Sequence, residues 1–313
     1  MSKKPLRLFS WYPELEHVKE PIDKLKLSPK EKETQYKSPL HALVGYRKMP
    51  VQSLSKCFWS SLTIHNDTGN IWTHLLPGLY FLYLAASTNR ELADLELNYE
   101  DRAVLVGYLL FATVTWFFSA AYHTFRAHSV AAYNFCLMCD LRGIILLLCG
   151  ANMLCISQTM KYFTFWRHFY HGINFTVLIC LFLWIPHMVK HRLSKQRTLY
   201  FSIYTIIGLF AWCHKMYFLL HDNQHILPVI KNYVDHYHSG WAHLISILTT
   251  YAIAGAGMVI RNLKYPERGF PYVFDIICSS HQIFHVVTAF GAYFSYKGLI
   301  DLMRSGAFPH HSS

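Results

Sequence analysis

Three histidines and one aspartate in this sequence have the side chains and the spacing of a metal site. His281 and His285 stand one helical turn apart in the segment SSHQIFH, so a helix would place both imidazoles on one face. His123 lies in SAAYHTF and Asp140 in CDLRGI. Three histidine ligands with an open fourth position are typical of a zinc centre that activates water. Each residue alone also fits a structural role, such as an ion pair between Asp140 and Arg142.

Ser119 is a further candidate because it precedes His123 by one helical turn and would share its face. Two interpretations of its hydroxyl stay open. It can bond back to a carbonyl of its own helix, which is a purely structural role. Alternatively, it can orient His123 or a bound water beside the metal.

The segments that carry these residues are long apolar runs. Apolar residues make up 53% of the 313 residues and charged residues 15%, whereas a soluble domain usually carries about a quarter charged residues. A helix needs roughly 20 apolar residues to cross the hydrocarbon layer. We therefore expect an all-α fold, a seven-transmembrane helix bundle, with spans at 70–88, 104–126, 137–157, 170–189, 199–220, 241–260 and 273–295.

The placement of lysine and arginine predicts the orientation of these spans. Twelve of them precede residue 70 and four lie in the loop 188–198 without an acid, whereas the loop between the first two spans is rich in acids. Because positive loops stay in the cytoplasm, the amino terminus should be cytoplasmic and the carboxyl terminus extracellular or lumenal. The expected organisation is a polar basic cytoplasmic arm at 1–56, a seven-helix membrane domain at 57–297 and a short external tail at 298–313.

This topology brings the candidate site together. The second span ends on the cytoplasmic side with His123, and the third begins there with Asp140. The seventh span carries His281 and His285 in its inner half. Ionisable residues inside a membrane are expensive and therefore mark functional sites by default. Three imidazoles and a carboxylate at one depth favour a shared metal site over four separate structural roles.

Other features of the sequence limit the function classes. The net charge is +11, but the basic residues form short clusters between apolar runs, which is typical of cytoplasmic loops and argues against a nucleic-acid partner. Most of the eight cysteines lie in apolar runs, where thiols pack as small hydrophobes, so no disulfide framework is expected. Cys136 and Cys139 form a lone C-x-x-C, which is either a pair of packing thiols or a metal or redox pair. The expected third and seventh spans carry no D-R-Y or N-P-x-x-Y motif of a rhodopsin-like receptor.

Four separated motifs resemble the progestin and adipoQ receptor family, and in particular its adiponectin receptor branch. The first is HNDTGNIWTHLL at 65–76, and the second is the S-x-x-x-H of Ser119 and His123. The third is D-x-x-G-I from Asp140, and the fourth is PERGFPYVFDIICSSHQIFH at 266–285. The resemblance covers residues 45–295, and the four motifs follow one another in the same order as in the family.

The resemblance implies a specific function. It implies seven helices with a cytoplasmic amino terminus, zinc bound by His123, His281 and His285, and a zinc-bound water held by Asp140. The family is similar to membrane hydrolases such as alkaline ceramidases, so the implied partners are a lipid or lipid-amide substrate and an extracellular protein or steroid ligand. The implied role is signalling in lipid metabolism. The plasma membrane is the default location, the Golgi and endoplasmic reticulum are alternatives, and the oligomeric state stays open.

Three hypotheses for the function stay open. The zinc site hydrolyses a lipid amide such as ceramide, or zinc only ties the second, third and seventh spans together in a receptor without enzymatic activity. A third hypothesis is an ion or proton transporter, suggested by His214 and Lys215 within the fifth span. The identity of the lipid and of the hormone stays open because the sequence departs from the family pattern at several positions. These positions are Pro77, Arg142, Pro271-Tyr272, His214 and Lys215.

Overall fold

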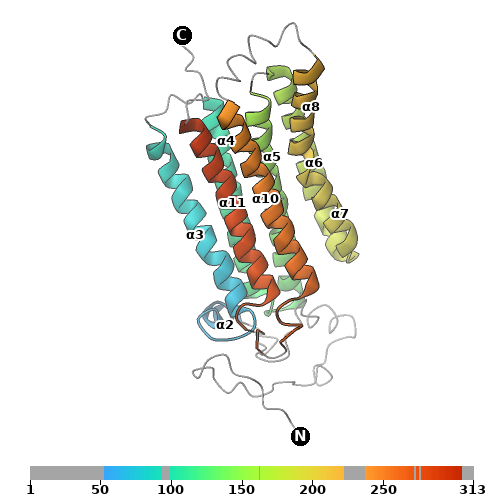
Figure 1. The fold of residues 1–313 in the computed structure, drawn as a ribbon. Helices are drawn as coiled ribbons and strands as arrows, with labels where there is room; N and C mark the ends of the chain where they lie inside the picture. Colours follow the sequence, from blue (N-terminus) through green and yellow to red (C-terminus); the bar gives the residue numbers. More distant parts are fainter. Residues whose placement is uncertain are drawn as a thin grey trace. The chain divides into compact units, whose positions relative to one another are not determined.

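The computed structural model describes residues 53–93, 99–161, 163–221, 237–270, 273–274 and 276–304, and the secondary structure within these ranges is helical, without a strand (Figure 1). The expected all-α class is therefore confirmed. The helices are α2 (Leu54–Ser60), α3 (Thr68–Glu91), α4 (Tyr99–Phe125), α5 (Val130–Thr159), α6 (Thr164–Lys190), α7 (Ser194–Thr205), α8 (Ile207–His221), α10 (Tyr237–Leu263) and α11 (Ser280–Arg304).

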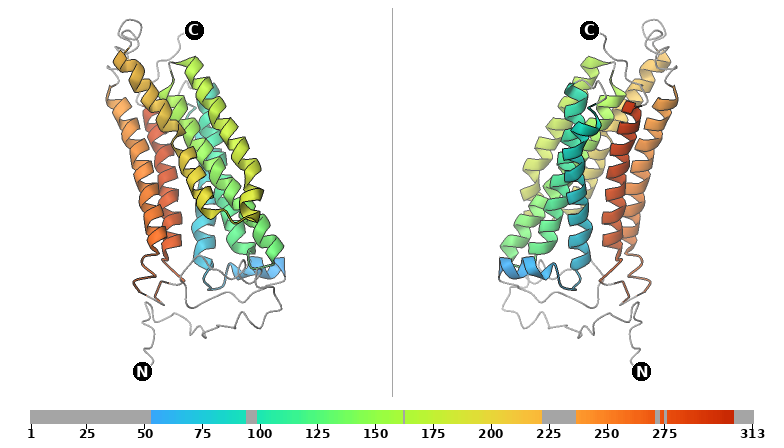
Figure 2. Two further views of the ribbon diagram at one scale, coloured as in Figure 1. Left: turned by 90° about the vertical axis from the view of Figure 1, so that its right-hand side faces the viewer. Right: turned by 90° about the vertical axis from the view of Figure 1, so that its left-hand side faces the viewer.

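The chain divides into two compact units, and each contains parts of several helices. The first unit comprises Met1–Pro77, Trp116–Asp140 and Ile253–Ala289. It therefore holds α2, the beginnings of α3, α5 and α11, and the ends of α4 and α10. In this unit α2 runs across the beginnings of α3 and α5 (Figure 2). The second unit comprises Gly78–Thr115, Leu141–Ala252 and Phe290–Ser313.

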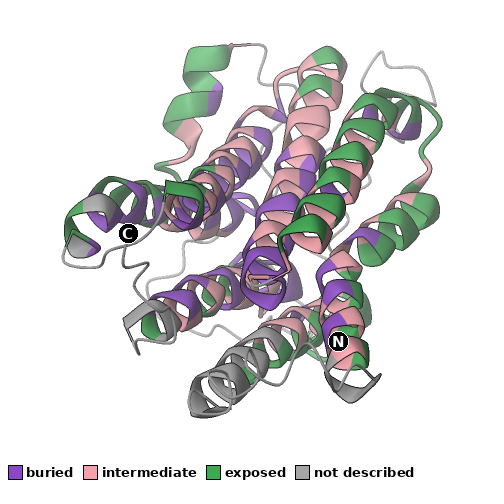
Figure 3. Cartoon of the chain, turned by 90° about the horizontal axis from the view of Figure 1, so that it is seen from above, coloured by how far each residue is buried: buried purple, intermediate pink, exposed green. Residues whose placement is uncertain are grey.

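Three of the described helices are long and apolar enough to cross a membrane, namely α4, α5 and α6. Buried and exposed residues alternate along the helices (Figure 3), and the exposed ones include large apolar side chains. On α6, Leu183 is 73% and Trp184 50% exposed. Water-soluble proteins rarely expose wide apolar patches, whereas lipid chains solvate them. These helices have the character of an integral membrane protein; the number of crossings and their direction stay predictions.

The fifth expected span, 199–220, is not one continuous helix. Helix α7 ends at Thr205 and α8 begins at Ile207, so the expected span contains a break near its middle. Hydropathy along the chain gives no sign of this break, because Ile206 and its neighbours are as apolar as a helix interior requires.

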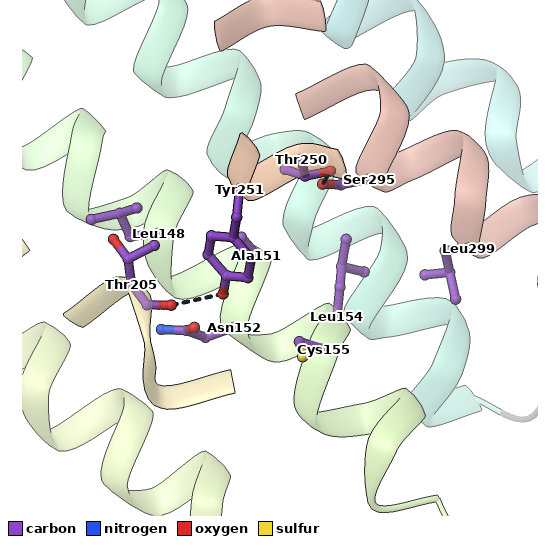
Figure 4. Close-up of a pocket in the computed structure, with 10 residues that line it drawn as sticks. All are labelled: Leu148, Ala151, Asn152, Leu154, Cys155, Thr205, Thr250, Tyr251, Ser295 and Leu299. Carbon is purple, nitrogen blue, oxygen red and sulfur yellow. Dashed lines mark hydrogen bonds between the residues drawn. The ribbon is translucent and has the colours of Figure 1, made fainter. Parts of the chain in front are cut away.

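Side chains from other helices of the second unit hold this break. Asn152 on α5 donates to the Tyr204 carbonyl at 2.9 Å and accepts from the Gly208 amide at 3.2 Å. The Tyr251 hydroxyl on α10 donates to the Thr205 carbonyl at 2.8 Å (Figure 4). A broken membrane helix is tolerated where neighbours satisfy its freed backbone groups in this way. Asn152, Thr205 and Tyr251 also line a cavity of about 60 Å³, which has room for ordered water.

Helix α11, which occupies the seventh expected span, begins later than expected, at Ser280 rather than at 273. The buried carboxylate of Glu267 accepts from the Ser280 amide at 2.7 Å and from its hydroxyl at 2.5 Å, so it caps the start of α11. Gln282 folds back and donates to the Ile276 carbonyl at 2.7 Å, while it accepts from the Cys278 amide at 2.8 Å. His281 consequently lies in the first turn of α11.

A buried histidine cluster as candidate metal centre

Four buried imidazoles gather in the first unit. His74 comes from the beginning of α3, His123 from the end of α4, and His281 and His285 from the beginning of α11. The ring centroids of His74 and His285 lie 3.7 Å apart, and those of His281 and His285 4.2 Å apart. His123 lies 5.5 Å from His74 and His285 and 5.4 Å from His281. The predicted convergence of His123, His281 and His285 is therefore present in the structure.

His74 is the residue that the sequence analysis missed. His74, His123 and His285 each offer one ligand atom, and these three atoms lie within 4.8 Å of one another. His281 is in ring contact with the group but outside this set. The signal for His74 was available in the sequence, because it is an ionisable side chain inside the expected first span.

The hydroxyl of Thr73 determines which nitrogen of His285 faces the cluster. Thr73 Oγ1 lies 3.0 Å from His285 Nδ1 and 2.7 Å from the Gly69 carbonyl oxygen. The hydroxyl has one proton, which it donates to the carbonyl, so it accepts from the N–H of His285 Nδ1. The lone pair of His285 is then on Nε2, as a metal ligand requires.

Ser119 contacts His74 rather than His123. Its Oγ lies 3.0 Å from His74 Nε2. The other ring nitrogen, His74 Nδ1, is buried without a hydrogen-bond partner among the described residues. Buried polar atoms are seldom left in this state, and a metal ion would satisfy this one. Ser119 therefore contacts the cluster through His74 and not through His123 as expected; its role as an orienting group stays a prediction.

The close approach of α3 and α11 depends on a glycine. A Cβ atom added at Gly69 would lie 2.4 Å from Nε2 of Gln282. Both polar ends of the Gln282 side chain are engaged by backbone groups in the turn before α11, so it has little freedom to move away. The glycine thus lets the Thr73 turn of α3 reach His285 on α11.

Asp140 belongs to the same unit as the four histidines. It is close enough to the Tyr122 hydroxyl and the Cys136 thiol to interact with both electrostatically. The ring centroid of Tyr122 lies 5.1 Å from that of His123, so Tyr122 packs against a member of the cluster. The role of Asp140 as the residue that holds a water stays a prediction.

Among the residues that depart from the family pattern, Pro77 lies within α3 in the first unit, and Pro271 and Tyr272 lie outside the described residues. Arg142, His214 and Lys215 belong to the second unit. The guanidinium of Arg142 lies over the Phe182 ring, 4.7 Å from its centroid. Nδ1 of His214 lies 3.1 Å from the Tyr170 hydroxyl, and Lys215 is buried on α8. Each is thus packed within the second unit.

Sequence comparison decides the family. The profile of haemolysin-III related proteins matches residues 62–296, most of the chain. The chain belongs to this family. The matched stretch includes the four histidines of the cluster and Asp140.

Several relatives of this haemolysin-III related protein carry receptor names. The chain is 27% identical over 262 residues to the adiponectin receptor protein of Drosophila melanogaster, covering 82% of this chain and 55% of that protein. It is 26% identical over 263 residues to progestin and adipoQ receptor-like protein 1 of Caenorhabditis elegans, covering 82% and 56%. It is 28% identical over 275 residues to membrane progestin receptor delta of Mus musculus, covering 83% and 74%. The chain spans little more than half the length of the first two relatives. These matches confirm the resemblance to the progestin and adipoQ receptor family that the four motifs indicated.

The cluster of this haemolysin-III related protein fits a divalent transition metal. Its donors are imidazole nitrogens, which suit zinc, copper, iron and nickel. His285 and His74 each have one ring nitrogen in contact with a neighbouring hydroxyl, and the other nitrogen of His74 has no hydrogen-bond partner among the described residues. Such polar partners orient metal-binding imidazoles and set their tautomers.

Proposed function

We propose that this chain is a membrane receptor of the adiponectin and progestin receptor type that binds zinc in its histidine cluster and hydrolyses a lipid amide such as ceramide. The observation that carries the proposal is the convergence of three buried histidine ligand atoms within 4.8 Å of one another. The buried Nδ1 of His74, without a described partner, supports a metal in that position. Zinc is the metal because histidine-rich sites with an open position are typical of it.

Two ligand sets share His123 and His285. The geometry favours His74 as the third ligand, whereas the family resemblance favours His281. When bound, zinc lowers the pKa of water toward ~7 and polarises a carbonyl oxygen. Zinc in proteins usually has four ligands, and each of these sets supplies three. Either set would therefore leave one coordination position open for a water molecule.

In the proposed hydrolysis Asp140 acts as the general base. Its carboxylate takes a proton from the water that attacks the amide carbonyl, and it returns that proton to the nitrogen of the leaving amine. Tyr122 packs against His123 and interacts electrostatically with Asp140, which would help to keep the carboxylate near the cluster. Thr73 and Ser119 hold their histidines in place without taking part in proton transfer.

Metal analysis of the purified protein, combined with a panel of long-chain lipid amides, tests this function. We expect about one zinc per chain and slow release of free amine and fatty acid that stops with a chelator and returns with zinc. A protein without zinc and without turnover would contradict the proposal.

A receptor with structural zinc is the second candidate. The ligands come from α3, α4 and α11, so a metal would tie three helices together. Ion or proton transport is the third, supported by buried Lys215 on α8 and by the break between α7 and α8. The names of the relatives support a protein or steroid as the receptor's ligand, and we propose the plasma membrane as its site, with the Golgi or endoplasmic reticulum as alternatives.

A further inference from the structure

Asp67 is a fully buried carboxylate that the proposed hydrolysis does not use. It directly precedes α3, and its carbonyl accepts the first helical bond from the Ile71 amide at 2.9 Å. Its own amide donates to Nδ1 of His65 at 3.1 Å, and Nε2 of His65 lies 3.0 Å from the Ser60 carbonyl oxygen. The backbone that carries Asp67 is therefore held on both sides.

One oxygen of this carboxylate faces three side chains. Asp67 Oδ1 lies 3.4 Å from Nδ1 of His123, 3.6 Å from the Arg126 guanidinium and 3.3 Å from the Asn70 amide nitrogen. Arg126 is 3% exposed. Asp67 is thus a buried acid with a buried cation on one side and a member of the histidine cluster on the other.

Stability alone does not account for this pair. Removing two charges from water costs about as much as their attraction returns, so buried ion pairs contribute little net stability. A carboxylate beside a metal-binding histidine has a different use, because it fixes the proton on the nearer nitrogen and raises the basicity of the farther one. The Arg126 charge offsets part of the cost of burying this carboxylate beside His123.

We propose that Asp67 is a positioning residue of the histidine cluster: its carboxylate, neutralised by Arg126, holds the proton of His123 on Nδ1 and so presents the Nε2 lone pair to a divalent metal. The proposal rests on the metal-binding part of the proposed function and is independent of whether the site is catalytic. Asp67 is the charged counterpart of Thr73 and Ser119, which hold His285 and His74 with neutral hydroxyls.

Zinc affinity of the full-length detergent-solubilised protein, measured by competition with a chelator of known affinity, tests the proposal. Asp67→Asn keeps the shape of the side chain and removes its charge, and we expect zinc affinity to fall about 10- to 100-fold. Asp67→Glu keeps a carboxylate and should recover most of the affinity. Asp67→Asn removes the negative charge beside the buried guanidinium of Arg126, so the Asp67→Asn/Arg126→Gln double variant provides a second version in which both charges are removed.

Asp101→Asn is the matched control. Asp101 is also a buried carboxylate facing a cation, with Oδ2 3.5 Å from Nζ of Lys161, but it lies in the second unit. We expect this variant to keep the affinity of the original chain even if its Tm falls. The proposal would be overturned if Asp67→Asn and Asp101→Asn lost zinc affinity equally. It would also be overturned if Asp67→Asn and the Asp67→Asn/Arg126→Gln double variant both kept wild-type zinc affinity.

The tautomer of His123 gives a readout without metal. In metal-free protein with ¹⁵N-labelled histidine, we expect the His123 signals, assigned by their loss in His123→Gln, to show the proton on Nδ1, and to shift toward the other tautomer in Asp67→Asn. An unchanged tautomer would contradict the role of Asp67 even if the protein binds zinc. A Nδ1–H tautomer that depends on Asp67 in a protein that binds no zinc would contradict the proposed metal site and leave Asp67 as a positioning residue of His123 alone.

Discussion

The hydroxyl oxygen of Ser119 on α4 lies 3.0 Å from Nε2 of His74 on α3, although 45 positions separate the two residues in the chain. The opposite nitrogen of His74, Nδ1, is buried without a hydrogen-bond partner among the described residues, and His74 groups with His123 and His285. If this nitrogen binds a metal, as we propose, Ser119 orients the His74 ring without contacting the metal itself.

Ser119→Ala should weaken zinc binding about 10-fold, because loss of an outer partner of a metal-binding histidine usually costs 10- to 100-fold in affinity. The measurement is chelator competition. Ser157→Ala is the control, since Ser157 makes an equivalent 3.0 Å contact with Nε2 of His171 in the second unit. A similar loss in both variants would mean that the effect is on overall folding.

His123→Ala and His285→Ala should each remove most of the zinc, because these two histidines are common to both of the alternative ligand sets. Plasma emission analysis of protein after gel filtration measures the metal. His74→Ala and His281→Ala then separate the two sets: loss only with His74 supports the geometric set, and loss only with His281 supports the family set. Wild-type zinc content in all four variants would eliminate the cluster as a metal site.

Asp140→Asn should keep the zinc and lose most of the turnover of a long-chain lipid amide, because an amide cannot accept the proton of the attacking water. General acid–base groups contribute about 10²- to 10⁴-fold in rate. The assay follows released amine with and without chelator. Structural zinc predicts instead no turnover and a lower Tm in chelator. Activity that survives both chelator and Asp140→Asn would indicate a contaminating hydrolase.

Gly69→Ala should lower the free energy of unfolding by about 1–3 kcal/mol, the usual effect of overpacking. The new methyl group would meet Gln282, whose side chain is anchored at both polar atoms. Thermal denaturation in detergent measures the change. Gly255→Ala on α10, where an added Cβ meets no atom within 4 Å, should be neutral or slightly stabilising. Equal Tm values for the two variants would contradict the close approach of α3 and α11.

Much of the fold could be predicted from local sequence. Long apolar runs require helices in a membrane, and α3, α4, α5, α6, α10 and α11 lie where such runs occur. The convergence of His123 with His281 and His285 followed from the order and direction of the spans. These predictions succeed because hydropathy and charge act over neighbouring residues and need no knowledge of distant partners.

The tertiary structure decided the features that depend on distant residues. The break between α7 and α8 depends on Asn152, which is 56 positions from Gly208. The start of α11 depends on Glu267, and the place of His74 in the cluster depends on Ser119. The contact on which the proposed role of Asp67 rests is with His123, 56 positions away. A side chain that satisfies a buried polar group elsewhere in the chain leaves no periodic signal in the sequence, since its effect exists only once the helices pack.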